Sequence, residues 1–179
     1  DVKEKFTDLF SRSFDSEGER FKRPMRENSR RKIRVGFLVT PGHEGGFLRL
    51  ARDMIERING DRFEPVLIYH GQSKRRMARH FRRRDLRQIA FGPDMESAVE
   101  QIRGAQCDVI YYWKVGADVW SFFLPMARLA AVQCTSWSTH GTSGHRFIDY
   151  YVSWDRAEPA NAAEHYTEKL FTLDCSPLY

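Results

Sequence analysis

Histidines, glycines and other polar residues are concentrated in two short stretches of the sequence. The first is residues 41–46, which contains Gly42, His43, Glu44, Gly45 and Gly46. The second is residues 136–145, which contains His140, Gly141, Thr142, Ser143 and Gly144. Glycines allow a backbone to approach a ligand closely, and hydroxyl groups donate hydrogen bonds to sugars, peptides or phosphates. Both stretches are therefore candidate ligand-binding loops.

His43 is the candidate catalytic residue of the first loop, with Glu44 beside it. An imidazole changes its charge near neutral pH and is the side chain that acts most often as a general base. Two alternatives stand next to this interpretation. In the first alternative, His43 only caps the following helix or faces solvent. In the second, the loop of residues 136–145 has a purely structural role.

Each loop needs a strand to position it, and both follow apolar runs. Residues 33–40 and 63–69 are rich in apolar and β-branched side chains, which predicts two buried strands. Between them, residues 47–58 place their apolar side chains on one face of a helix. A strand, a glycine-rich turn, a helix and a second strand predict a parallel βαβ unit.

The alternation continues along the chain. Further strands are expected over residues 86–91, 108–113, 130–134 and 147–152, and helices over residues 74–87, 93–103 and 158–166. Residues 120–129 are expected to form a helix or a helical turn. The predicted fold class is α/β, with a Rossmann-like, doubly wound and mostly parallel sheet of about six strands. Ligands bind such sheets at the carboxyl ends of the strands, so both loops are expected at that edge.

Composition and motifs exclude several classes of function. The sequence has no G-x-G-x-x-G or Walker pattern, and His70-Gly71-Gln72 replaces the acidic residue that would hold a ribose, which excludes NAD and FAD binding. No cofactor and no metal site are predicted. No apolar run is long enough to span a membrane. Three widely spaced cysteines predict free thiols in a reducing compartment, and hence the cytoplasm.

The net charge of +5 comes mostly from basic clusters, one of which spans residues 74–87. Met77 and Phe81 are four residues apart within it, which predicts an amphipathic helix with a solvated basic face. Nucleic-acid binding is not favoured, because the sequence has neither zinc-ligand spacing nor an RNA-stacking motif.

Several further segments carry a resemblance to a known family. They are Gln133, Gly141-Thr142-Ser143-Gly144, Asp149-Tyr150, residues 164–170 (EHYTEKL), residues 33–37 and residues 61–66. In this order and spacing, residues 32–179 resemble the SPINDLY-type O-GlcNAc transferases, which are glycosyltransferases of the GT-B class. The resemblance implies the N-terminal lobe of a GT-B fold. Residues 1–31 are expected to be a helical, basic lead-in or linker, because Phe6, Leu9, Phe10 and Phe14 have helical spacing and the remainder up to Arg31 is polar and basic.

The resemblance also implies a function. The lobe would hold the acceptor, a protein or another hydroxyl compound, while a second lobe beyond Tyr179 would hold most of the nucleotide-sugar donor. The isolated chain is then expected to be inactive. The family carries histidines in the first loop, and His43 takes that role only if the loop shifts by two residues. His140 stands where the family has proline.

Other matching residues are expected to be structural. Tyr166, Glu168 and Lys169 are expected to serve packing and helix capping, and Tyr111, Tyr112 and Trp113 to narrow the cleft or stack on a sugar. Two alternatives to the enzyme lobe stay open. One is a non-catalytic interaction module derived from such a lobe, and the other is a Rossmann-like binder of a small phosphorylated ligand.

Overall fold

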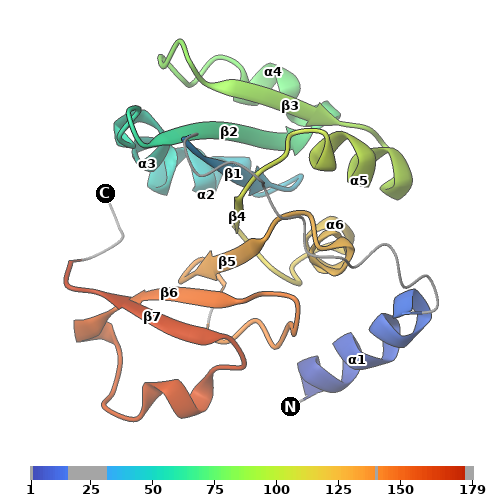
Figure 1. Ribbon diagram of the computed structural model, residues 1–179, viewed down its shortest axis with the longest axis vertical. Coiled ribbons are helices and arrows are strands. Elements are labelled where there is room, and N and C mark those ends of the chain that lie inside the picture. Colours follow the sequence, from blue (N-terminus) through green and yellow to red (C-terminus); the bar gives the residue numbers. More distant parts are fainter. Residues whose placement is uncertain (1, 16–31, 140, 176–179) are drawn as a thin grey trace.

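The computed structural model describes residues 2–15, 32–139 and 141–175, so most of the expected linker, residues 16–31, lies outside the described residues. Seven strands form one sheet in the order β3-β2-β1-β4-β5-β6-β7 (Figure 1). Every pair of neighbouring strands is parallel. The strands are β1 (Ile33–Val39), β2 (Phe63–His70), β3 (Arg87–Phe91), β4 (Val109–Tyr112), β5 (Val132–Ser136), β6 (Tyr150–Trp154) and β7 (Lys169–Leu173). The predicted α/β, Rossmann-like sheet is confirmed.

Helices and short helical turns connect the strands. The α-helices are α1 (Val2–Asp15), α2 (Glu44–Leu50), α3 (Arg52–Arg57), α4 (Lys74–Met77), α5 (Met95–Arg103) and α6 (Val119–Phe123). The 3-10 turns are η1 (Gly71–Ser73), η2 (Leu124–Ala127), η3 (Asp155–Ala157) and η4 (Ala162–His165).

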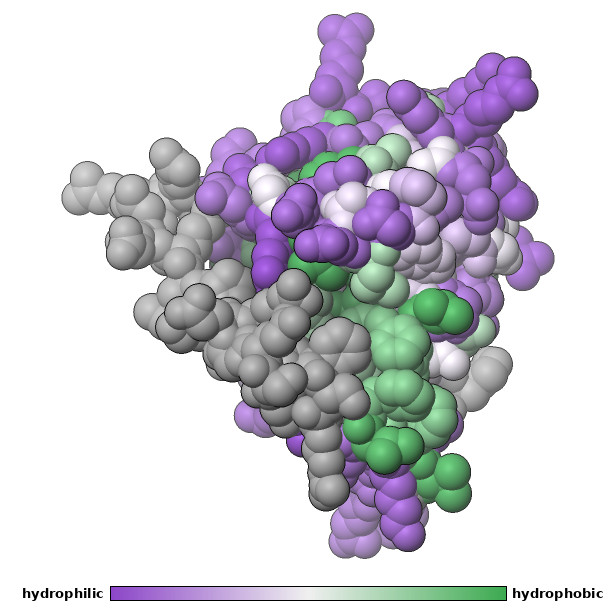
Figure 2. Space-filling model, turned by 90° about the vertical axis from the view of Figure 1, so that its right-hand side faces the viewer, coloured by the Kyte–Doolittle hydropathy of each residue, from purple (hydrophilic) through white to green (hydrophobic). Residues whose placement is uncertain are grey.

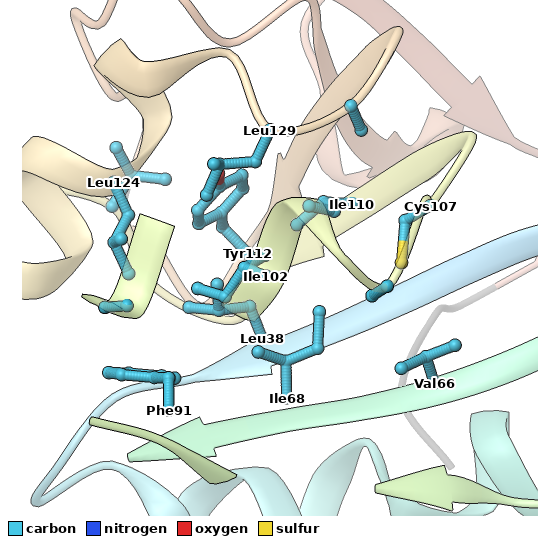
Figure 3. Close-up of a cluster of buried hydrophobic side chains, with 14 of the residues drawn as sticks. Leu38, Val66, Ile68, Phe91, Ile102, Cys107, Ile110, Tyr112, Leu124 and Leu129 are labelled. Atoms are coloured by element: carbon cyan, nitrogen blue, oxygen red, sulfur yellow. The ribbon is translucent and has the colours of Figure 1, made fainter. Parts of the chain in front are cut away.

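The sheet has an apolar core on each face, because successive side chains of a strand point to opposite faces. Leu38 of β1 points into one core, where Ile68, Ile110 and Tyr112 of the neighbouring strands meet Ile102 of α5 (Figure 3). The adjacent residues of β1, Phe37 and Val39, point into the other core, against α2 and α3. Burial on both faces explains the continuous apolar runs from which β1 and β2 were predicted.

Two predicted helices differ from the structure in the first half of the chain. The helix expected over residues 47–58 is split at Ala51 into α2 and α3. The basic helix expected over residues 74–87 was wrong beyond its first turn, since α4 ends at Met77. The guanidinium of Arg83 donates to the carbonyl oxygens of Ile55 and Ile58, at 3.1 and 2.7 Å, which draws the chain back along α3 instead of extending α4.

The second half of the chain brings further corrections. The helix or helical turn expected over residues 120–129 is present as the short α6 followed by the turn η2, which has Pro125 near its start and the left-handed Arg128 as its C-cap. The strands expected over 130–134 and 147–152 lie two to three residues later, as β5 and β6. The helix expected over 158–166 is reduced to the single turn η4.

The seventh strand, β7, was missed. It is a five-residue edge strand whose side chains are largely exposed, with Phe171 54% accessible, and its three apolar residues, Leu170, Phe171 and Leu173, form too short a pattern to distinguish a strand. Tyr166 and Glu168 were expected to serve packing and helix capping; Tyr166 is the C-cap residue of η4 and packs on the ring of Tyr151, whereas capping was wrong for Glu168. The hydroxyl of Tyr166 donates to Glu158 at 2.9 Å, and Glu168 binds the loop of residues 142–143.

The helix α1 packs against α6 and the loop that precedes β6. The rings of Phe6 and Phe10 contact those of Phe122 and Phe123. The Thr7 hydroxyl donates to the carbonyl of Gly144 at 3.3 Å. Figure 2, which looks at the side where α1 and α6 lie in Figure 1, shows apolar side chains gathered there. Among the residues of these two helices whose burial is described, the exposed large apolar ones are Val2, Phe6, Leu9 and Val119.

Candidate functional site

The turn between β1 and α2 presents His43 at the carboxyl edge of the sheet. Gly42 has φ +86°, a left-handed conformation that glycine adopts without strain. The next residue, His43, is the N-cap of α2, and its backbone N–H donates to the carbonyl of Thr40 at 3.2 Å. Its side chain makes no capping hydrogen bond to the helix. The imidazole is therefore available for other partners.

Asp118 is the partner of the His43 imidazole. Its Oδ2 lies 3.5 Å from His43 Nε2 and accepts a hydrogen bond of 2.7 Å from the Thr40 hydroxyl. Its other oxygen, Oδ1, accepts from the backbone N–H groups of Trp120 and Ser121, in a capping box at the start of α6. The carboxylate is thus fixed by a helix end and faces the histidine. Sequence reasoning missed Asp118, although Asp118 and Ser121 have the spacing of such a cap.

His43 lines a hollow of about 220 Å³, the His43 hollow. The first loop and the start of the second loop meet there, around the residues that follow β4. The lining consists of Gly42, His43, Gly46, Leu50, Trp113, Lys114, Trp137 and Ser138. The Trp113 ring packs edge-on against those of Phe47 and Trp137, which holds it in this wall. The arrangement combines a histidine, a lysine and two indole rings at one opening.

Glu44 and Gly45 of the first loop face away from this hollow. Glu44 is buried, accepts a hydrogen bond from the Ser73 hydroxyl and lies 3.8 Å from the Arg76 guanidinium. A Cβ on Gly45 would stand 2.9 Å from the same guanidinium. These two residues therefore join the first loop to η1 and α4. The titratable side chain that the first loop contributes to the hollow is that of His43.

The glycine-rich part of the second loop is held elsewhere. Thr142 donates its hydroxyl to Glu168 at 2.7 Å, and Ser143 donates both its hydroxyl and its backbone N–H to the same carboxylate. Gly141 and Gly144 adopt positive φ angles of 72° and 64°. The two hydroxyl groups are thus engaged inside the protein. His140, predicted as a ligand-binding residue, lies outside the described residues.

His145, which follows this loop, is buried, and its contacts are with other residues of the protein interior. Its Nε2 donates to the carbonyl of Phe122 at 2.9 Å, and its ring contacts those of Phe122 and Phe147. Burial lowers the pKa of His145 to about 4, because the charged imidazolium loses its hydration there. His145 is therefore neutral at pH 7.

A second and larger hollow of about 580 Å³, the sheet-face hollow, lies on the α3 side of the sheet. Its apolar walls come from alternate residues of β1, β4 and β5 and from α3, and it shares Leu50, Trp113 and Trp137 with the His43 hollow. The Tyr111 hydroxyl pairs with that of Ser136 at 2.5 Å in its wall. Tyr112 points to the opposite face and donates to Gln133 at 2.9 Å.

Within residues 2–15, 32–139 and 141–175, no group of three or more His, Cys, Asp or Glu side chains is arranged to hold a metal ion. In the same part of the chain, no helix has the length and apolar character needed to cross a membrane.

Comparisons with known proteins bear on the fold. No protein-family model and no curated protein matches the sequence. The structure is similar to that of a Thermobaculum terrenum O-GlcNAc transferase mutant, with a TM-score of 0.65 and 22% sequence identity. The similar region covers 88% of this chain and 30% of the other chain. The likeness supports a fold of the GT-B, O-GlcNAc transferase type, and this chain spans under a third of that protein's length.

Proposed function

We propose that residues 32–179 form the acceptor-side lobe of a cytoplasmic glycosyltransferase of the SPINDLY type. In this proposal the enzyme transfers a sugar from a nucleotide-sugar donor to a hydroxyl group of a protein or another acceptor. A second lobe in the parent protein supplies most of the donor site. The fold and the sequence resemblance of residues 133–170 support the assignment to glycosyltransferases of the GT-B class. The arrangement of His43 supports it at the level of chemistry.

The observation that carries the proposal is the contact between His43 and Asp118 at the mouth of the His43 hollow. With Nε2 directed at the carboxylate, the other ring nitrogen, Nδ1, has no hydrogen-bond partner among the described residues. An acceptor hydroxyl in the hollow can donate its proton to Nδ1 as the sugar transfers, and Asp118 then stabilises the imidazolium. Hydrogen bonds of this kind are often long in unliganded sites and shorten with substrate bound.

The test uses the parent protein with its second lobe. His43→Ala is expected to lower turnover by about 10²–10⁴-fold, the range for loss of a general base. Binding of the nucleotide product, measured by calorimetry, is expected to stay unchanged because the other lobe holds it. His165→Ala, at an exposed position of η4, serves as the control. Equal turnover of wild type and His43→Ala would refute the catalytic role.

A non-catalytic interaction module is the second candidate. It is favoured by the second loop, whose hydroxyl groups are engaged by Glu168, and by the apolar sheet-face hollow. Under this alternative, His43→Ala leaves the parent protein's properties unchanged, while Val35→Asp or Met54→Asp in the sheet-face hollow abolishes partner binding. The same set of variants therefore separates the two candidates.

A further inference from the structure

A dense group of basic side chains lies on α4 and on the segment that leads to β3. Seven of them are exposed, and they are called the arginine face: Lys74, Arg75, Arg76, Arg79, Arg82, Arg84 and Arg87. The acidic residue of this segment, Asp85, is engaged by Arg83 at 2.7 Å. Within the described part of the chain, Lys74, Arg75 and Arg79 have no carboxylate within ion-pair distance. Their charges are therefore available to an outside partner.

The arginine face borders the candidate site. The helix α4 follows the carboxyl end of β2, at the same edge of the sheet as the turn that carries His43. Glu44 of that turn contacts Ser73 and Arg76, so the first residues of α4 lie directly beside the turn. Lys114 adds a further positive charge at the lining of the His43 hollow. An extended anionic chain that leaves the hollow past Glu44 would meet these cations next.

We propose that the arginine face binds the acidic flank of a polypeptide acceptor, whose hydroxyl side chain enters the His43 hollow. This inference rests on the proposed function and adds a substrate class to it. Guanidinium groups bind carboxylates through paired N–H donors, and arginines outnumber lysine six to one on this face. Such a surface also steers an acidic chain toward the site before contact.

Two observations favour an acidic polypeptide over other anionic partners. Surfaces that bind single-stranded nucleic acid add Phe, Tyr or Trp rings on which bases stack, whereas Phe81, which is the Phe, Tyr or Trp of this segment, packs against the core. Membrane-binding helices insert exposed apolar side chains, whereas Met77 of α4 is fully buried. The exposed surface of the segment is almost entirely charged or polar, which suits a water-filled interface with carboxylates.

The experiment measures binding to the chain of residues 1–179 by fluorescence anisotropy. The probes are a labelled serine peptide flanked by glutamate and aspartate, and the same peptide with glutamine and asparagine in their places. Arg75→Glu/Arg79→Glu is expected to weaken binding of the acidic peptide by about tenfold or more, as reversal of two charges removes several attractive pairs. Arg156→Glu/Lys169→Glu changes the net charge equally at exposed positions beside β6 and β7, at the opposite end of the sheet from β3, and is expected to have little effect.

Higher salt is expected to weaken binding of the acidic peptide and to leave binding of the neutral peptide unchanged. The proposal is overturned if both double variants weaken binding equally, or if the two peptides bind alike. It is also overturned if an oligoribonucleotide or an anionic lipid vesicle of matched charge binds more tightly than the acidic peptide. The assay needs no turnover. If His43→Ala leaves the turnover of the parent protein unchanged while the acidic peptide still binds through Arg75 and Arg79, the proposed catalytic role is refuted and the arginine face is supported.

Discussion

The carboxylate of Glu168 binds Ser143 twice, accepting from its hydroxyl and, at 2.8 Å, from its backbone N–H. The same side chain accepts from the hydroxyls of Thr142 and Thr167, at 2.7 and 3.1 Å. One buried acidic residue at the start of β7 therefore fixes the conformation of a glycine-rich loop that precedes β6. Hydrogen bonds to a charged acceptor are the stronger kind, so this carboxylate is a main stabiliser of the loop.

Glu168→Gln is expected to lower the free energy of unfolding by about 2 kcal/mol. The amide keeps the size of the side chain but loses the charge and turns one acceptor into a donor that faces other donors. Urea denaturation measures the change, and Glu164→Gln, at an exposed position, is the control. An unchanged midpoint for Glu168→Gln would show that the loop is held by other contacts.

Gln133 is fully buried and joins four segments through its amide. Its Nε2 donates to the carbonyls of Pro125 and Phe147, and its Oε1 accepts from the Tyr112 hydroxyl and the Leu129 N–H. Gln133→Met is expected to cost about 3 kcal/mol or more, because it leaves several buried polar groups without a partner. Gln72→Met, at an exposed site, should change the unfolding free energy by less than about 0.5 kcal/mol. Similar urea midpoints for the two variants would contradict this role.

Phe10→Ala is expected to loosen α1. The Phe10 ring lies 5.5 Å from that of Phe123 and 6.0 Å from that of Phe122, between centroids, and each aromatic contact stabilises by about 0.5–1.5 kcal/mol. Amide hydrogen exchange should accelerate in α1 and in residues 141–147 together, since Thr7 binds the Gly144 carbonyl. Leu9→Ala removes an exposed side chain of the same helix and should leave exchange unchanged. Faster exchange in α1 alone would show that the loop does not depend on it.

Acid is expected to destabilise the protein through His145. Burial lowers the pKa of His145 to about 4, below its ordinary value of 6.5. The unfolded chain therefore binds the proton first as the pH falls, and stability is lost between about pH 6.5 and pH 4. Between pH 7 and pH 5 the loss attributable to this residue is about 2 kcal/mol. His145→Gln should remove that part of the pH dependence, whereas His165→Gln, at an exposed site, should retain it. Urea denaturation at the two pH values provides the comparison.

Strands buried on both faces were predictable from the sequence to within one residue. Residues 33–40 and 63–69 were expected, and the structure has Ile33–Val39 and Phe63–His70. Their continuous apolar runs reflect local burial, which composition reports directly. The start of β6 was not predictable in this way. The carbonyl of Phe147 accepts hydrogen bonds from Gln133 and Arg128, and those long-range bonds hold residues 147–149 outside the strand.

In the candidate site, too, features set by the local sequence were predictable, and features set by long-range contacts were not. The turn with Gly42 and His43 was recognisable because glycine and histidine follow a strand. Asp118 was not recognised, since its meeting with His43 depends on the parallel pairing of β1 with β4, which brings distant segments to one edge. The engagement of Thr142 and Ser143 by Glu168 depends likewise on β7, the strand that sequence reasoning missed.

The contact between Thr7 and Gly144 joins residues 137 positions apart, which has a consequence for biosynthesis. The helix α1 leaves the ribosome before any of its partners exist. At about 5–20 residues per second, roughly 7 to 27 s pass before the loop with Gly144 has been translated. During that interval Phe6 and Phe10 of α1 are without their docking surface, the rings of Phe122 and Phe123. The helix α1 therefore docks only after the loop with Gly144, 137 residues later in the chain, has been made.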